Sequence, residues 1–228
     1  MLSGPRWLAL EVKYLDRARS FYEAFLDLEV RRGTDTEATM AVGETDLVLR
    51  APSTVPRGGL HTHYAMTVPA GEYDDWYDRL EERFDLVEHQ FGSARSLYFY
   101  DTEGNCVELG ERADADGPGV SGVFEVVFEV EDIPRAVEFY ETLEFEVVDR
   151  GEGRNRVRLS CSGFDIELWE PHLGLADARG GVHVDVGIGA TDPGGRAEAL
   201  ADEALAVKPI DSGVRLRDPD GHYLTLLE

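Results

Sequence analysis

The sequence predicts an α+β fold of four βαβββ modules, paired into two domains. The first observation is a repeat: Arg19–Val30 resembles Ala136–Val148, and the Phe-Tyr-Glu tripeptide they share recurs at an offset of 118 residues. The turn that begins at Asp101 recurs at Asp218, an offset of 117 residues. The second observation is that each half contains the same strand and helix pattern twice. Nearly constant offsets indicate a duplicated domain.

The repeat sets the expected domain boundaries. A polar stretch containing Gly and Pro, residues 113–121, has linker composition and separates the halves. The first domain is expected at residues 1–112, with module 1 at about 5–55 and module 2 at about 58–112, and the second at residues 122–228, with module 3 at about 122–172 and module 4 at about 180–228.

Hydrophobic periodicity predicts the elements of the first half in order. Alternation of apolar and polar residues predicts a strand at Trp7–Val12. An apolar face formed by Phe21, Tyr22, Phe25 and Leu26 predicts an amphipathic helix after this strand. Short strands follow, and the pattern then restarts. The expected elements are a strand at Trp7–Val12, a helix from about Asp16, strands to Asp46–Arg50, a strand at Leu60–Val68, a helix near Tyr73–Phe84, a turn at Asp101–Asn105 and a strand at Cys106–Gly110.

The second half repeats this order. Asp132 is a good N-cap, and Pro134 suits the first turn of the helix that follows. His222 lies in the last turn, where we expect it to be solvated. The expected elements are strands at Val123–Val130 and on to Trp169, a strand at Val182–Gly189, a helix at Gly194–Leu205 and a strand at Tyr223–Leu227.

The charge balance is strongly acidic. The chain has 46 Asp and Glu against 22 Lys and Arg, a net charge of −24, and only Lys13 and Lys208 are lysines. Phosphate backbones would be repelled, so we expect no nucleic-acid partner. The carboxylates are spread through periodic segments, which indicates a folded acidic surface. With so few lysines, this surface is typical of adaptation to a salt-rich cytoplasm, and we expect a halophile.

Other classes of protein are disfavoured by what the sequence lacks. There is no apolar run near the roughly 20 residues that span a bilayer, and acidic residues interrupt the N-terminal segment where a signal peptide would be apolar. We therefore expect a cytoplasmic protein without a membrane partner. Cys106 and Cys161 lie in predicted strands without CxxC spacing, which disfavours a cysteine zinc site. Phosphate-loop and nucleophile-elbow motifs are absent from the sequence.

The Phe-Tyr-Glu helix and the D-x-[DE]-G-[NH] turn before the last strand resemble the vicinal oxygen chelate superfamily. Its members include glyoxalase I, bleomycin-resistance proteins, methylmalonyl-CoA epimerase and extradiol dioxygenases. The resemblance covers essentially the whole chain. It implies that paired modules form a curved sheet around a cavity. It also implies a divalent metal held there by a residue of each module's first strand and one of its last strand.

The resemblance places the ligand positions one by one. Module 1 offers Trp7 and Val48, which cannot bind a metal, and module 4 offers His183 and Thr225. The positions in modules 2 and 3 are His63, Glu108, Glu125 and Glu167. With modules paired within each half, the resemblance implies two incomplete sites, one of His63 and Glu108 and the other of Glu125, Glu167 and His183. The metal would be Fe, Mn, Ni, Co or Zn.

Strand alternation adds support from the residues themselves. In Val123–Val130 the alternate apolar residues must cover the helix, so Glu125 and Glu129 face the opposite, concave side. The same reasoning places Glu167, His183 and Asp185 on concave faces. Such carboxylates would raise one another's pKa without a cation. Alternatively, they belong to a solvated acidic surface. Arg50, expected on a cavity face beside Asp46, would meet an anionic substrate or pair with that aspartate.

These observations favour a divalent-metal-dependent glyoxalase-like enzyme of the lyase or isomerase type. Its small-molecule substrate would chelate the metal through vicinal oxygens, and Glu125 or Glu167 would act as ligand or catalytic base. The alternative is a bleomycin-resistance-like protein that binds a small molecule without catalysis. A dioxygenase-like oxidoreductase is less favoured, because neither expected site shows two histidines and one carboxylate. The chain is expected to be a monomer or a homodimer.

Overall fold

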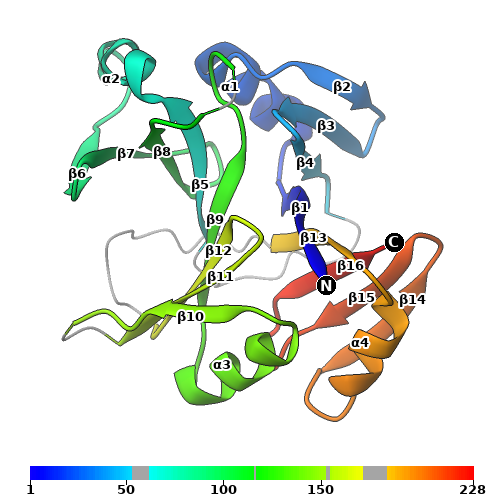
Figure 1. The fold of residues 1–228 in the computed structure, drawn as a ribbon. Coiled ribbons are helices and arrows are strands. Elements are labelled where there is room, and N and C mark those ends of the chain that lie inside the picture. The colour runs from blue at the N-terminus through cyan, green and yellow to red at the C-terminus, as the bar shows by residue number, and fades with distance from the viewer. Residues whose placement is uncertain (53–61, 116, 153–154, 172–183) are drawn as a thin grey trace.

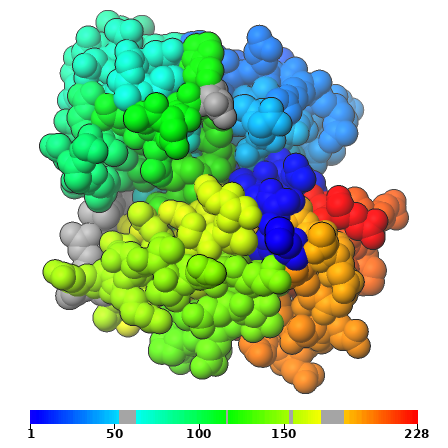
Figure 2. All heavy atoms as spheres, viewed as in Figure 1, coloured from blue at the N-terminus to red at the C-terminus, as the bar shows by residue number. Residues whose placement is uncertain are grey.

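The computed structural model describes residues 1–52, 62–115, 117–152, 155–171 and 184–228. Within these ranges, two curved eight-stranded sheets and four α-helices form a mixed α+β fold (Figure 1). The predicted fold class is confirmed. Figure 2 shows the four modules as four quadrants of one molecule, with the first half of the chain above and the second half below.

The first half contains two βαβββ modules, as predicted. Module 1 consists of β1 (Leu2–Glu11), α1 (Leu15–Leu26), β2 (Val30–Gly33), β3 (Glu37–Val42) and β4 (Thr45–Arg50). Module 2 consists of β5 (Thr62–Pro69), the 3-10 turn Ala70–Glu72, α2 (Tyr73–Glu81), β6 (Val87–Phe91), β7 (Ala94–Tyr100) and β8 (Cys106–Arg112).

The second half has the same order, with one shorter helix. Module 3 consists of β9 (Val123–Glu129), α3 (Ile133–Thr142), β10 (Glu146–Asp149), β11 (Arg156–Cys161) and β12 (Phe164–Trp169). Module 4 consists of β13 (Val184–Ala190), α4 (Pro193–Ala199), β14 (Ala206–Ile210), β15 (Gly213–Arg217) and β16 (Tyr223–Leu227). The predicted helix at Gly194–Leu205 is wrong at its C-terminal end, since two glycines in its first turn weaken a helix that ends at Ala199.

The sheets do not follow the two halves of the chain. One sheet has the order β14-β15-β16-β13-β1-β4-β3-β2 and joins modules 1 and 4. The other has the order β10-β11-β12-β9-β5-β8-β7-β6 and joins modules 2 and 3. The seams are antiparallel pairs of first strands, β1 with β13 and β5 with β9. This corrects the expectation that the modules of one half share a sheet. The seams are backbone ladders, which carry no sequence motif. The sequence boundaries of the two domains stay a prediction.

Modules of the same half pack back to back through their helical layers. In the first half the Phe21 ring lies 5.7 Å from the ring of Phe84, and Arg79 on α2 forms an ion pair with Asp27 at the end of α1. In the second half, Tyr140 on α3 bonds to the turn before β16. The two helices of each half lie at the same end of the molecule, α1 and α2 at the top and α3 and α4 at the bottom, while each sheet bridges the halves (Figure 1).

A single contact explains why the Phe-Tyr-Glu helix and the Asp turn occur together. The Tyr22 hydroxyl donates to Asp101 Oδ2 at 2.6 Å, and Tyr140 donates to Asp218 Oδ2 at 2.8 Å. The helix tyrosine of one module thus holds the turn aspartate of its partner module within the same half. The prediction that His222 is solvated is wrong, because its ring is buried and stacks 4.3 Å from the Phe128 ring.

Two further expectations concern the cysteines and the surface. Cys106 lies in β8 and Cys161 in β11, as predicted. None of the helices in the described ranges combines the length and the apolar character that a membrane crossing requires. Salt adaptation stays a prediction that rests on the charge of −24.

Candidate metal centre

A cavity of about 300 Å³ lies on the concave face of the sheet that joins modules 2 and 3. It lies at the small end of the usual range for ligand sites. Because the sheet crosses the halves, all four ligand positions of these modules line this one cavity. They are His63 on β5, Glu108 on β8, Glu125 on β9 and Glu167 on β12.

The strand register explains how these side chains converge. Glu108 and Glu125 both pair with Ala65, one on each side of β5, so the small alanine leaves room between the two carboxylates. One step along the ladder, His63 and Glu167 both pair with Val127. Residues two apart on a strand face the same side, so two adjacent rows of the sheet present four polar side chains to the cavity.

Three of these residues form a possible metal site. One ligand atom each from His63, Glu108 and Glu125 lies within 4.8 Å of the others, and all three residues are buried. His63 Nε2 lies 3.0 Å from Glu108 Oε2. One imidazole nitrogen with carboxylate oxygens suits Zn²⁺, Mn²⁺, Fe²⁺, Co²⁺ or Ni²⁺. This is the one such cluster within the described ranges.

The carboxyl group of Glu125 lies in an environment that disfavours its ionised form. Its burial, followed by the nearby charges of Glu167 and Glu108, raises the pKa of its carboxyl well above the usual value. Its Oε2 atom is buried and accepts no hydrogen bond from the described residues, although Arg158 Nη2 lies 2.9 Å away. A buried carboxylate oxygen without a hydrogen bond is costly, and a cation at this point would offset that cost. The residues present therefore fit a divalent metal.

Glu108 is held in place by its neighbours. Burial opposes its ionisation, but hydrogen bonds from His63, Ser96 and Tyr98, together with the His63 charge, give it a lowered pKa. Ser96 and Tyr98 both lie on β7, the next strand of the sheet. Side chains that bond to a ligand carboxylate in this way orient it toward a metal.

Glu167 lies beside the three-residue cluster and is anchored separately. Its Oε1 accepts from Arg156 Nη1 at 2.7 Å and from Arg158 Nε at 2.8 Å, and its Oε2 accepts from Trp169 Nε1 at 2.7 Å. Arg158 also forms the ion pair with Glu125, so one guanidinium links the two carboxylates of module 3.

Sequence reasoning missed Arg156 and Arg158, although a signal for them exists. They alternate on β11 with the buried residues Val157 and Leu159, and therefore share the concave face with Glu167. The same rule of alternation that selected Glu167 would have selected them. Ser96 and Tyr98 were missed because nothing in the sequence distinguishes them from other strand residues.

The expected division of the ligands into two incomplete sites is corrected by the sheet pairing. His63 and Glu108 meet Glu125, with Glu167 beside them, in one cavity built from both halves. His183 lies outside the described residues. Asp185, expected among the same carboxylates, lines the other sheet's cavity and contacts Arg50 and Arg215 there.

The fold and the site define a class of proteins in which paired βαβββ modules enclose a cavity lined by polar residues of their first and last strands. Residues 4–109 match the family model described as the Glyoxalase/Bleomycin resistance protein/Dioxygenase superfamily. Residues 4–109 are therefore similar to members of that superfamily.

Sequence relatives match about half of the chain, and solved structures match its fold. A metallothiol transferase FosB of Staphylococcus haemolyticus is 26% identical over 116 residues, which cover 48% of this chain and 84% of that protein. The match to the structure of a putative dioxygenase from Bacillus subtilis covers 99% of this chain and 85% of that chain, at 17% identity and a TM-score of 0.78. The match to the structure of glyoxalase I from Zea mays covers 100% of this chain and 92% of that chain, at 19% identity and a TM-score of 0.75. The two structures share the fold of the whole chain.

In chelator-treated protein, Glu125→Gln is expected to raise the melting temperature. A neutral amide removes a buried charge that is repelled by Glu167 and Glu108, and this outweighs the loss of the Arg158 ion pair. A gain of about 1 kcal/mol corresponds to about 2–4 °C for a chain of this size. Thermal unfolding in EDTA measures it, with the exposed Glu138→Gln on α3 as the matched control. A lower melting temperature would show that the ion pair dominates.

Proposed function

We propose that the chain is a divalent-metal-dependent, glyoxalase-like enzyme of the lyase or isomerase type. Its substrate is a small molecule that presents two adjacent oxygens. The observation that carries the proposal is the cluster of His63, Glu108 and Glu125, three buried potential ligands within 4.8 Å of one another on the concave face of one sheet. The superfamily match and the metallothiol transferase relative support a metal-dependent role.

His63, Glu108 and Glu125 would hold the ion, and Ser96 and Tyr98 would orient Glu108. A divalent ion in such a site acts as a Lewis acid that polarises substrate oxygens. Glu167 lies beside the cluster in an orientation held by two arginines and an indole N–H, and in this proposal it moves the substrate proton. Arg156 and Arg158 line the same cavity and would attract an anionic group of the substrate.

Metal analysis tests the proposal most directly. Protein purified in high salt without chelator is expected to contain about one equivalent of a transition metal per chain, since three protein ligands are typical of catalytic sites. Glu125→Gln is expected to lose the metal, whereas Glu167→Gln should retain it. With a hydroxyketone probe such as acetoin in D₂O, NMR should show deuterium exchange at the carbon that bears the hydroxyl group. Glu167→Gln should abolish that exchange. Wild-type protein that neither contains nor binds a metal would refute the proposal.

The second candidate is a metal-free protein that binds a small molecule without catalysis. The observation that favours it is the position of Arg158, whose guanidinium lies 2.9 Å from Glu125 and 2.8 Å from Glu167 and so neutralises part of the site. In that case chelation would leave ligand binding unchanged. Ring cleavage by a two-histidine, one-carboxylate centre is not proposed, because the described cluster contains one histidine.

A further inference from the structure

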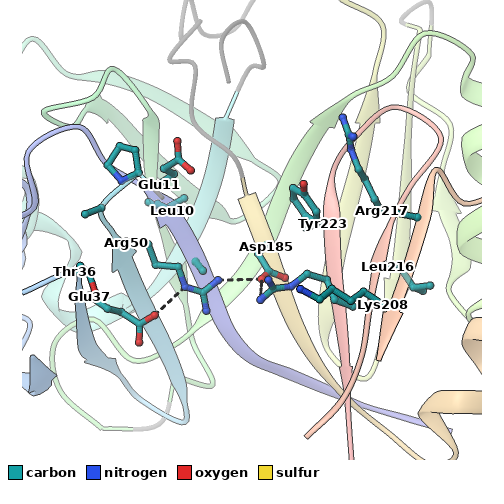
Figure 3. A pocket seen from close by; sticks show the side chains of 15 residues that line it. Leu10, Glu11, Thr36, Glu37, Arg50, Asp185, Lys208, Leu216, Arg217 and Tyr223 are labelled. Atoms are coloured by element: carbon teal, nitrogen blue, oxygen red, sulfur yellow. Dashed lines mark hydrogen bonds and ion pairs between the residues drawn. The ribbon is translucent and has the colours of Figure 1, made fainter. Parts of the chain in front are cut away.

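The sheet that joins modules 1 and 4 has its own cavity, of about 590 Å³, which we call the basic cavity (Figure 3). It is about twice the volume of the cavity in the other sheet. Four cationic side chains line it beside three carboxylates, those of Glu11, Glu37 and Asp185, in a chain that carries a net charge of −24. The four cations are Arg50, Lys208, Arg215 and Arg217.

The described residues of the basic cavity lack the ligand pattern of the other site. Three corresponding strand positions hold Trp7, Val48 and Thr225, and the fourth lies outside the described residues. The Trp7 ring lies so close to Gly187 across the β1–β13 seam that a Cβ at Gly187 would be 2.4 Å from it. An indole therefore occupies space at the seam, where the other sheet presents Glu125.

Two of the four cations are held by one buried aspartate. Asp185 Oδ2 lies 3.0 Å from Arg50 Nη1 and 2.8 Å from Arg215 Nη2, and Arg50 also pairs with Glu37 at 3.0 Å. Figure 3 shows the side chains of Arg50 and Asp185 pointing toward each other, joined by a dashed line. Of the two roles expected for Arg50, pairing with Asp46 is wrong, since Asp46 pairs with Arg31 instead. Asp185 and Glu37 thus fix these two guanidinium groups and together balance their charge.

The other two cations, Lys208 and Arg217, form no ion pair among the described residues. Lys208 lies on β14 directly opposite Arg215 on β15, and like charges in this arrangement destabilise a sheet. Arg217 donates to the Gly221 carbonyl at 3.4 Å and lies over the Tyr223 ring, so it has no carboxylate partner either. Acidic residues outnumber basic ones in this chain by 46 to 22. Even so, Lys208 and Arg217 line one cavity, and neither forms an ion pair with a carboxylate among the described residues.

We propose that the basic cavity binds a small organic anion without a metal. Lys208 and Arg217 receive its carboxylate or phosphate group, while the Tyr223 ring and the aliphatic residues Ala51, Pro52 and Leu216 contact its apolar part. Charge-assisted hydrogen bonds to Lys and Arg are the usual means of holding such groups. Bound anion would also relieve the repulsion between Lys208 and Arg215. This site is separate from the metal centre, so the two proposals stand or fall independently.

The test uses phenyl phosphate and benzoate as probes on the full chain, after EDTA treatment. Isothermal titration calorimetry is expected to show saturable binding of at least one probe, and benzyl alcohol, which lacks the charge, should not bind. Lys208→Gln combined with Arg217→Gln should weaken binding about tenfold or more, because a hydrogen bond to a charged group contributes substantially. The matched control is Lys13→Gln with Arg17→Gln, two exposed cations outside the cavity. Its affinity should equal that of the wild type.

The single variant Lys208→Gln tests whether a loss of binding is caused by misfolding. Without ligand its melting temperature should equal or exceed that of the wild type, because a like-charge pair has been removed. Three results would overturn the proposal: no saturable binding of either probe, equal binding by the double variant, or binding that disappears in His63→Ala. The last result would place the anion in the other cavity.

Discussion

Replacing His63 by alanine is expected to lower metal affinity by more than about 100-fold, because changes to residues that merely support metal ligands already cost 10- to 100-fold. His63 provides the one nitrogen of the cluster, and its Nε2 lies 3.0 Å from Glu108 Oε2. Competition with a chromogenic chelator measures the affinity. Gln90→Ala on β6 is the control, since this exposed residue lies outside the cluster and the cavity and should leave affinity unchanged.

The same measurement tests whether the halves of the chain share one site. His63 and Glu108 belong to the first half and Glu125 to the second, yet the β5–β9 seam places them together. His63→Ala and Glu125→Gln should therefore both abolish tight binding of the same single metal. If Glu125→Gln left the affinity intact, the site would belong to the first half alone and the shared cavity would carry no metal.

The repeat in the sequence could reveal the modules but not their pairing. Local signals such as alternation, the Asp132 cap and Pro134 predicted most elements, because each depends on neighbouring residues. The motifs that carry the repeat, around Tyr22 and Asp101, report contacts within a half, where the helical layers meet. The seams that join the halves are ladders of backbone hydrogen bonds, which any residue except proline can form. For this reason no side-chain pattern distinguished the observed pairing from the expected one.

The same limit explains what was predicted about the site. His63, Glu108, Glu125 and Glu167 could be selected because each occupies a defined strand position in its own module. Whether they meet depends on the sheet pairing, so two incomplete sites were expected where one cavity contains all four. Arg158 links Glu125 and Glu167 across three strands, a relation that becomes visible only when β9, β11 and β12 lie side by side.

The largest effect on stability is expected from Asp218→Ala, a change at the turn that precedes β16. Asp218 is fully buried, and its Oδ1 accepts from the backbone N–H groups of Asp220, Gly221 and His222. Its Oδ2 accepts from the Tyr140 hydroxyl, which ties the turn to α3. The substitution leaves several buried donors without an acceptor and should cost roughly 3–5 kcal/mol of unfolding free energy, the range measured when buried charged partners are removed.

Chemical denaturation at constant high salt measures this loss, and two further variants show where it arises. Tyr140→Phe removes one hydrogen bond and should cost about 1–2 kcal/mol, because the aspartate keeps its three backbone donors. Asp211→Ala, at an exposed residue in the β14–β15 turn, should change stability by less than about 0.5 kcal/mol. If Asp218→Ala cost no more than Tyr140→Phe, the backbone bonds of the turn would contribute little. The hydrogen bond from Tyr140 would then account for what the repeated aspartate turn contributes to this fold.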